Sequence, residues 1–131
     1  MIIEEKDRIT DKTHLAKTIA EKSSIKTAIP AVLDLIDNHL EHGVEIYRDG
    51  VLAGYMLIFN FFGIRSFHGY KLVEGYGVRA LRLAKALIKK FDIRESATTL
   101  DQEKTRRALS ILGFSIKKQS GEFLTFERGL A

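Results

Sequence analysis

The 131-residue sequence contains no cysteine, no tryptophan and a single proline, Pro30. Without cysteine the chain cannot form disulfides, a thiolate zinc site, an iron–sulfur cluster or a thiol nucleophile. One proline beside 10 glycines excludes collagen-like and proline-rich disordered chains. No apolar run reaches the ~20 residues of a membrane-spanning helix, and the charged start Met-Ile-Ile-Glu-Glu-Lys lacks the apolar core of a signal peptide. We therefore expect a soluble, cytoplasmic protein without membrane contacts.

Length and charge narrow the function classes further. Residues 1–131 suit a single domain, because domains cluster near ~100–150 residues and no linker-like segment divides this chain. Lysine and arginine number 21 against 17 acidic residues, for a net charge of +4. This mildly basic balance favours anionic partners, such as a phosphate-bearing cofactor or nucleic acid.

Helical patterns dominate the first third of the chain, and strand patterns follow. Asp11 or Thr13 is expected to cap a helix that runs to about Lys22. A second helix is predicted over about 29–42, ended by Gly43 as its C-cap. Further expected elements are strands over 44–46, 51–60 and 64–73, a helix over 78–91, a strand over 93–99, a helix over 102–112 capped by Asp101, and terminal strands over 114–118 and 122–127. The order ααβββαβαββ predicts an α/β (α+β) fold, with a mixed, mostly antiparallel sheet and about four helices.

The turn Gly75-Tyr76-Gly77 is the most informative local feature, because it connects a predicted strand to a predicted helix. Such a turn leaves several main-chain N–H groups unpaired at the positive end of the helix dipole. Arg79 adds a full positive charge in the first helical turn. The sequence therefore predicts an anion site suited to a pyrophosphate, although both glycines also serve a tight turn.

The sequence over about residues 10–128 resembles the GNAT (Gcn5-related N-acetyltransferase) superfamily. The likeness rests on the element order and on the ending, in which a helix closes with Leu112-Gly113-Phe114 before two last strands. It implies a GNAT-like fold and acetyl-CoA or CoA as cofactor. The family's phosphate signature, Gln/Arg-x-x-Gly-x-Gly/Ala, aligns with residues 72–77, where leucine replaces Gln/Arg and Glu74 adds a negative charge. The cofactor-binding residues implied are Leu72, Val73, Gly75, Tyr76, Gly77, Val78 and Arg79.

The resemblance also implies a reaction, the transfer of an acyl group from CoA to an amine. In that family the cofactor lies between the fourth and fifth strands and its pantetheine arm runs beside the fourth strand. A strand amide near Leu72 or Val73 would polarise the thioester carbonyl. The candidate general bases are Glu74, His68 and Glu45, and the candidate proton donors are Tyr70 and Tyr76. Leu109 stands where many members carry a tyrosine general acid, and no asparagine follows Asn60.

Two alternatives stay open. Degenerate members of this kind are similar to GNAT-like proteins of tailed phages, so the chain is alternatively a catalytically inactive virion or DNA-delivery protein, located in the host cytoplasm or the virion. A basic nucleic-acid-binding module is the other alternative, suggested by Arg79, Arg82, Lys85, Lys89 and Lys90 on one helix. The resemblance also allows a homodimer through the terminal strands. The four histidines form no metal-binding pattern, although His39 and His42 would share a helix face.

Overall fold

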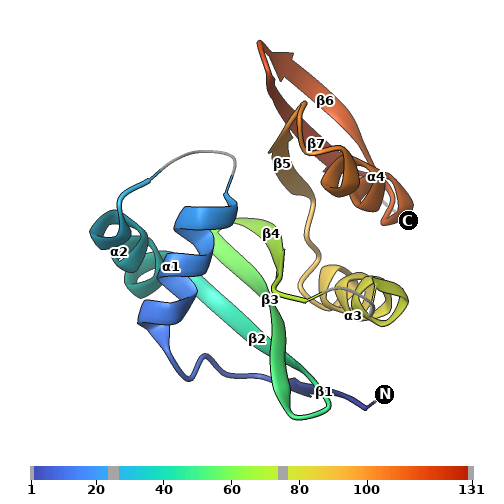
Figure 1. Cartoon of the computed structure of the whole chain (residues 1–131). Coiled ribbons are helices and arrows are strands. Elements are labelled where there is room, and N and C mark those ends of the chain that lie inside the picture. Colours follow the sequence, from blue (N-terminus) through green and yellow to red (C-terminus); the bar gives the residue numbers. More distant parts are fainter. Residues whose placement is uncertain (1, 24–26, 74–76, 130–131) are drawn as a thin grey trace.

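The computed structural model describes residues 2–23, 27–73 and 77–129, which form one mixed sheet with helices on both faces (Figure 1). In chain order the elements are β1 (Ile3–Lys6), α1 (Lys12–Lys22), α2 (Ile29–His39), β2 (Leu40–Arg48), β3 (Val51–Phe61), β4 (Ile64–Lys71), α3 (Gly77–Lys90), β5 (Glu95–Thr99), α4 (Glu103–Ile111), β6 (Phe114–Ser120) and β7 (Phe123–Arg128). The predicted fold class is confirmed, and so is the succession of elements from α1 onward.

The strands lie in the order β1-β2-β3-β4-β5-β7-β6. Neighbouring strands are antiparallel except β4 and β5, which run parallel. Parallel neighbours need a crossover connection, and α3 supplies it. β3 is buried on both faces along residues 53–59, which confirms the central strand predicted from its apolar sequence.

Two apolar clusters occupy the two faces of the sheet. The cluster beneath α1 and α2 contains Leu15, Val32 and Leu57, and its strand residues come from β2, β3 and β4 only. The cluster beneath α3 and α4 extends from Val44 on β2 to Phe114 on β6. Only the second cluster therefore packs strands from both ends of the sheet together.

The predicted end of the second helix is wrong. Helix α2 ends at His39, and the next residues continue as β2, which pairs with β3 from Leu40 opposite Phe59. Gly43 is therefore a strand residue and not a C-cap. A Cβ at Gly43 would lie 2.6 Å from Cγ1 of Ile9, so glycine allows the segment before α1 to cross close to β2.

Helix α1 begins as predicted, whereas the predicted cap of α4 is wrong. The Asp11 carboxylate accepts a hydrogen bond from the His14 N–H at 3.0 Å and caps α1. The N-cap of α4 is Gln102, one residue after the predicted Asp101, and the Gln102 side chain makes no capping hydrogen bond. The edge strand β1, with Ile3 opposite Arg48, was not predicted, because its pairing with β2 depends on tertiary contacts.

Candidate active site

The boundary between β4 and β5, called the seam below, is the least bonded part of the sheet. Among the described residues, the two strands pair only at Ser66 and Glu95. One side-chain contact reinforces the pair, since the Ser96 hydroxyl donates to the Phe67 carbonyl at 3.3 Å. Beyond this point β5 leaves β4 and continues with β7 and β6 (Figure 1). The second half of β4 therefore has a sheet neighbour on one side only.

The register of β4 on β3 decides which main-chain groups face the seam. In an antiparallel ladder, alternate residues exchange hydrogen bonds with the partner strand, and the residues between them point their N–H and C=O groups away. The Leu72 N–H donates to the Ala53 carbonyl at 2.8 Å. The main-chain groups of the even-numbered residues of β4 therefore point toward β3. The main-chain groups of the odd-numbered residues, including Phe67 and Gly69, point toward β5, in agreement with the hydrogen bond from Ser96 to the Phe67 carbonyl. The main chain of Gly69 thus points into the open part of the seam.

The amides of Leu72 and Val73, predicted to polarise a thioester carbonyl, are engaged within the fold. Both donate to the Ala53 carbonyl, at 2.8 and 3.3 Å. These hydrogen bonds argue against the predicted oxyanion role of either amide. Sequence reasoning missed Gly69, although a glycine inside a strand often marks a place where another backbone or a ligand approaches.

His68 lies on the α1/α2 face of β4, beside the seam. Its Nε2 is 3.1 Å from the Ser66 hydroxyl, and its ring meets the Phe59 ring edge-on at a centroid distance of 5.6 Å. Burial lowers the pKa of His68 from 6.5 to about 4. The imidazole is therefore neutral at pH 7 and is a weak base for a protonated amine, which argues against His68 as the general base.

Tyr70 lies on the same face of β4, two residues after His68 and closer to the end of the strand that leads to α3. Burial raises the pKa of its phenol, against an opposing hydrogen bond with Ser23 at the end of α1. The hydroxyl is protonated at neutral pH, as an ordinary tyrosine is, and is able to donate a hydrogen bond, while its raised pKa makes it a weaker acid. This state suits the proton-donor role that the sequence predicted for Tyr70.

Glu45, the third predicted base, lies away from the seam. It is a buried β2 residue directly opposite Tyr55, so β3 separates it from β4. Burial would raise the pKa of the carboxyl, but hydrogen bonds from the Thr10 N–H (2.9 Å), the Thr10 hydroxyl (2.8 Å) and Tyr47 outweigh it and lower the pKa. Glu45 therefore anchors the segment before α1, and the prediction that it serves as a base is not supported by its position.

The predicted phosphate site is described only in part. Gly77 is the first residue of α3, and Val78 and Arg79 are exposed in its first turn. Glu74, Gly75 and Tyr76 lie outside the described residues. Arg79 is consequently the one charged residue of the predicted phosphate site whose location is described, in the helix that follows β4 in the chain.

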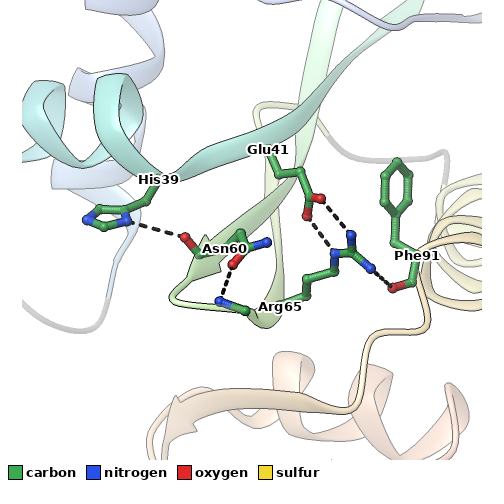
Figure 2. A network of polar contacts seen from close by, with 6 residues as sticks. His39, Glu41, Asn60, Arg65 and Phe91 are labelled. Carbon is green, nitrogen blue, oxygen red and sulfur yellow. Dashed lines mark hydrogen bonds and ion pairs between the residues drawn. The ribbon is translucent and has the colours of Figure 1, made fainter.

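At the other end of the seam, polar contacts hold Arg65 of β4 to β2 and to the residue that follows α3 (Figure 2). The Arg65 guanidinium donates to both Glu41 carboxylate oxygens, at 2.7 and 2.8 Å, and to the Phe91 carbonyl after α3 at 3.3 Å. The hydrogen bond with Arg65 lowers the pKa of Glu41. On the β7 side, Arg128 donates from Nε to the Ile93 carbonyl at 2.9 Å. The seam is therefore fastened where α3 ends and unpaired where α3 begins.

The described residues offer neither a cluster of metal ligands nor a membrane-spanning helix. No group of three or more His, Asp or Glu side chains is placed to hold a metal ion in residues 2–23, 27–73 and 77–129. The expectation that His39 and His42 share a helix face is wrong, because His42 is on β2. None of the helices in the described part of the chain is long and apolar enough to cross a membrane.

Comparison with known proteins gives structural likeness only. No protein-family model matches the chain, and no curated protein matches its sequence. Among solved structures, a protein of Desulfovibrio desulfuricans assigned to the GNAT family of acetyltransferases superposes with a TM-score of 0.69 at 16% identity, covering 99% of this chain and 100% of the other. The Campylobacter jejuni N-acetyltransferase PseH in complex with acetyl-CoA gives a TM-score of 0.65 at 12% identity, with coverage of 99% and 100%.

A third structure extends the comparison to a CoA complex. The PaiA N-acetyltransferase of Thermoplasma acidophilum in complex with CoA gives a TM-score of 0.64 at 15% identity, with coverage of 99% and 100%. These likenesses confirm the GNAT-like fold that the sequence resemblance implied, over nearly the whole chain.

Proposed function

We propose that this protein is a divergent GNAT-fold N-acyltransferase that transfers an acyl group, typically acetyl, from CoA to an amine. The observation that carries the proposal is the unpaired edge of β4 at Gly69, directly before the connection to α3. A strand edge with free main-chain groups binds an extended, amide-containing chain in the way that it would bind an additional β-strand. The pantetheine arm of CoA is such a chain. The structures of PseH with acetyl-CoA and of PaiA with CoA support the same ligand class.

The residues present fit CoA at both ends of this edge. The Gly69 N–H and C=O face the space that β5 leaves, and glycine presents no side chain there. Arg79 in the first turn of α3 provides positive charge for phosphate groups, together with the N-terminal amides of the helix. We propose that Gly75, Tyr76, Gly77 and Val78 complete this phosphate site.

Two residues carry out the proton transfers in this proposal, one as the base and one as the acid. Glu74 would accept a proton from the attacking amine, because His68 is too weak a base and Glu45 lies beyond β3. Tyr70, which is protonated at neutral pH, would supply a proton to the departing sulfur. His68 instead keeps a neutral, hydrogen-bonded contact with Ser66 beside the seam.

The test is a thermal-shift titration with acetyl-CoA on the wild type, Gly69→Ala and Gly69→Pro. A ligand that binds the folded state raises Tm by mass action. Proline removes the N–H that faces the seam and leaves the β3 ladder intact, so we expect Gly69→Pro to lose the shift. Gly69→Ala is the matched control, since its Cβ would meet only a ring carbon of Phe67, at 3.8 Å, and it should bind as the wild type does.

Arg79→Glu provides an independent variant if Gly69→Pro does not fold. It should weaken acetyl-CoA binding and leave the weaker binding of acetyl-pantetheine, which has no nucleotide phosphates, unchanged. Absence of a shift in the wild type at millimolar acetyl-CoA would rule out the proposal. Binding without thiol release from a panel of primary amines would support the alternative of an inactive GNAT-like protein, and salt-sensitive DNA binding without a CoA shift would support the nucleic-acid alternative.

A further inference from the structure

A second concave surface lies between α4 and β6, away from the seam. It is a groove of about 480 Å³, within the usual size of small-molecule sites. The α4 residues Arg106 and Ser110 form one wall, and Phe114 and Ser115 of β6 form the other. β7 lies between β5 and β6 in the sheet, so this groove is separate from the β4–β5 opening.

The two arginines of the groove differ in their partners. Arg107 is exposed and pairs with Glu103 one helical turn earlier, at 3.2 Å. Arg106 is half-buried, and its Nε is shielded from solvent without a hydrogen-bond partner within the described part of the chain. A buried N–H without an acceptor is costly, and native proteins nearly always pair such groups. Arg106 is thus the unneutralised cation of the groove.

Glu103 also lines the groove, where Arg107 neutralises it, and the rest of the lining is apolar or hydroxylic. Phe114 and Phe126 are buried at the floor, and Ile116 is 59% exposed on the edge strand. Ser110, one helical turn after Arg106, offers a hydroxyl group on the same face of α4. A ligand for this lining needs an oxyanion at one end and an apolar body at the other.

We propose that the α4–β6 groove binds a small amphipathic anion, with its carboxylate or phosphate on Arg106 and its apolar part against Ile116 and the two phenylalanines. The guanidinium fork of arginine matches both oxyanions through two parallel N–H donors. The ligand's oxygens would accept hydrogen bonds from the guanidinium of Arg106, and the Ser110 hydroxyl would donate to a remaining oxygen. A compact groove with one unpaired cation suits a small molecule better than a nucleic-acid backbone, which needs several phosphate contacts.

The test is an NMR titration of the ¹⁵N-labelled full chain with benzoate, phenyl phosphate and benzyl alcohol. We expect saturable shifts at the amides of Ser110, Phe114 and Ile116 with the anions, and about tenfold weaker binding of the uncharged alcohol. Whichever anion binds more tightly, benzoate or phenyl phosphate, shows whether the groove prefers a carboxylate or a phosphate. Saturation with acetyl-CoA should leave these shifts unchanged, which separates this groove from the seam.

Arg106→Gln should weaken binding of the preferred anion about tenfold or more. Arg106→Lys, which keeps the charge but loses the fork, should lie between the wild type and Arg106→Gln and decides the matter if Arg106→Gln does not fold. Lys104→Gln is the matched control, because it removes an exposed charge of α4 that does not line the groove. Shifts that are absent, or equal in wild type and the Arg106 variants, would overturn the proposal.

Discussion

The two sides of β4 are bonded very differently. Toward β3 it keeps a continuous ladder from Gly54–Lys71 to Phe61–Ile64. Toward β5 only Ser66 and Glu95 pair among the described residues. The sheet nevertheless holds together, because the apolar cluster beneath α3 and α4 crosses the seam, whereas the cluster beneath α1 and α2 does not. Side-chain packing on one face thus replaces backbone pairing and leaves main-chain groups of β4 open to a ligand.

The largest expected effect comes from removing the packing that crosses the seam. Leu57 and Ile58 are adjacent, fully buried residues of β3 that face opposite clusters. Truncation of either to alanine should lower the free energy of unfolding by about 2–5 kcal/mol. Only Ile58→Ala, which weakens the cluster shared by both halves, should also accelerate hydrogen exchange preferentially in β5 and β7.

Native-state hydrogen exchange measures this difference residue by residue. Leu57→Ala is the matched control, with the same strand and nearly the same loss of side-chain volume. Equal acceleration of β5 and β7 exchange in both variants would show that the two halves are not joined mainly through the α3/α4 cluster.

A second prediction concerns pH and the α1/α2 face of β4. The pKa of His68 falls from 6.5 to about 4 on folding because of its burial, so the unfolded chain binds a proton that the folded chain excludes. His68 therefore contributes stability above pH 6.5, and this contribution is lost as the pH falls toward 4. The loss is about 3 kcal/mol between these limits.

His68→Gln removes this titration and keeps a polar group beside Ser66. Urea unfolding of both proteins between pH 7 and pH 4 should show the wild type losing stability relative to the variant. Acidic groups with lowered pKa values, such as Glu41 and Glu45, titrate in both proteins and cancel in the comparison. A constant difference between the two proteins across this range would contradict the burial of a neutral imidazole.

The elements with strong local patterns were predictable from the sequence. The apolar stripe of α3, the Asp11 cap of α1 and the two-sided apolar character of β3 all reflect short-range periodicity, and all are confirmed. The errors arise where tertiary contacts override local signals. Gly43 has the local signature of a helix end, but it pairs with Leu57 of β3 as a strand residue, and the close approach of Ile9 leaves no room for a Cβ there.

The candidate site was less predictable than the fold. The sequence located the β4–α3 connection from its glycines and placed His68 and Tyr70 on one strand face. It could not reveal that the Leu72 and Val73 amides bond to Ala53 or that Gly69 faces the seam, because both depend on strand register. Register is set by pairing between distant segments, which composition and periodicity do not encode.

The smallest expected effect concerns the fastened end of the seam, where Arg65 joins Glu41 and the Phe91 carbonyl (Figure 2). Both side chains are partly exposed, so solvent screens the pair, and a double-mutant cycle of Arg65→Gln and Glu41→Gln should give a coupling of about 0.5–1 kcal/mol in chemical unfolding. The coupling should decrease in high salt. Since the seam is held chiefly by the α3/α4 cluster, Arg65→Gln should leave exchange in β5 nearly unchanged. Exchange there as fast as in Ile58→Ala would instead assign the joining of the two halves to the hydrogen bond between Arg65 and the Phe91 carbonyl, because Glu41 on β2 lies on the same side of the seam as Arg65.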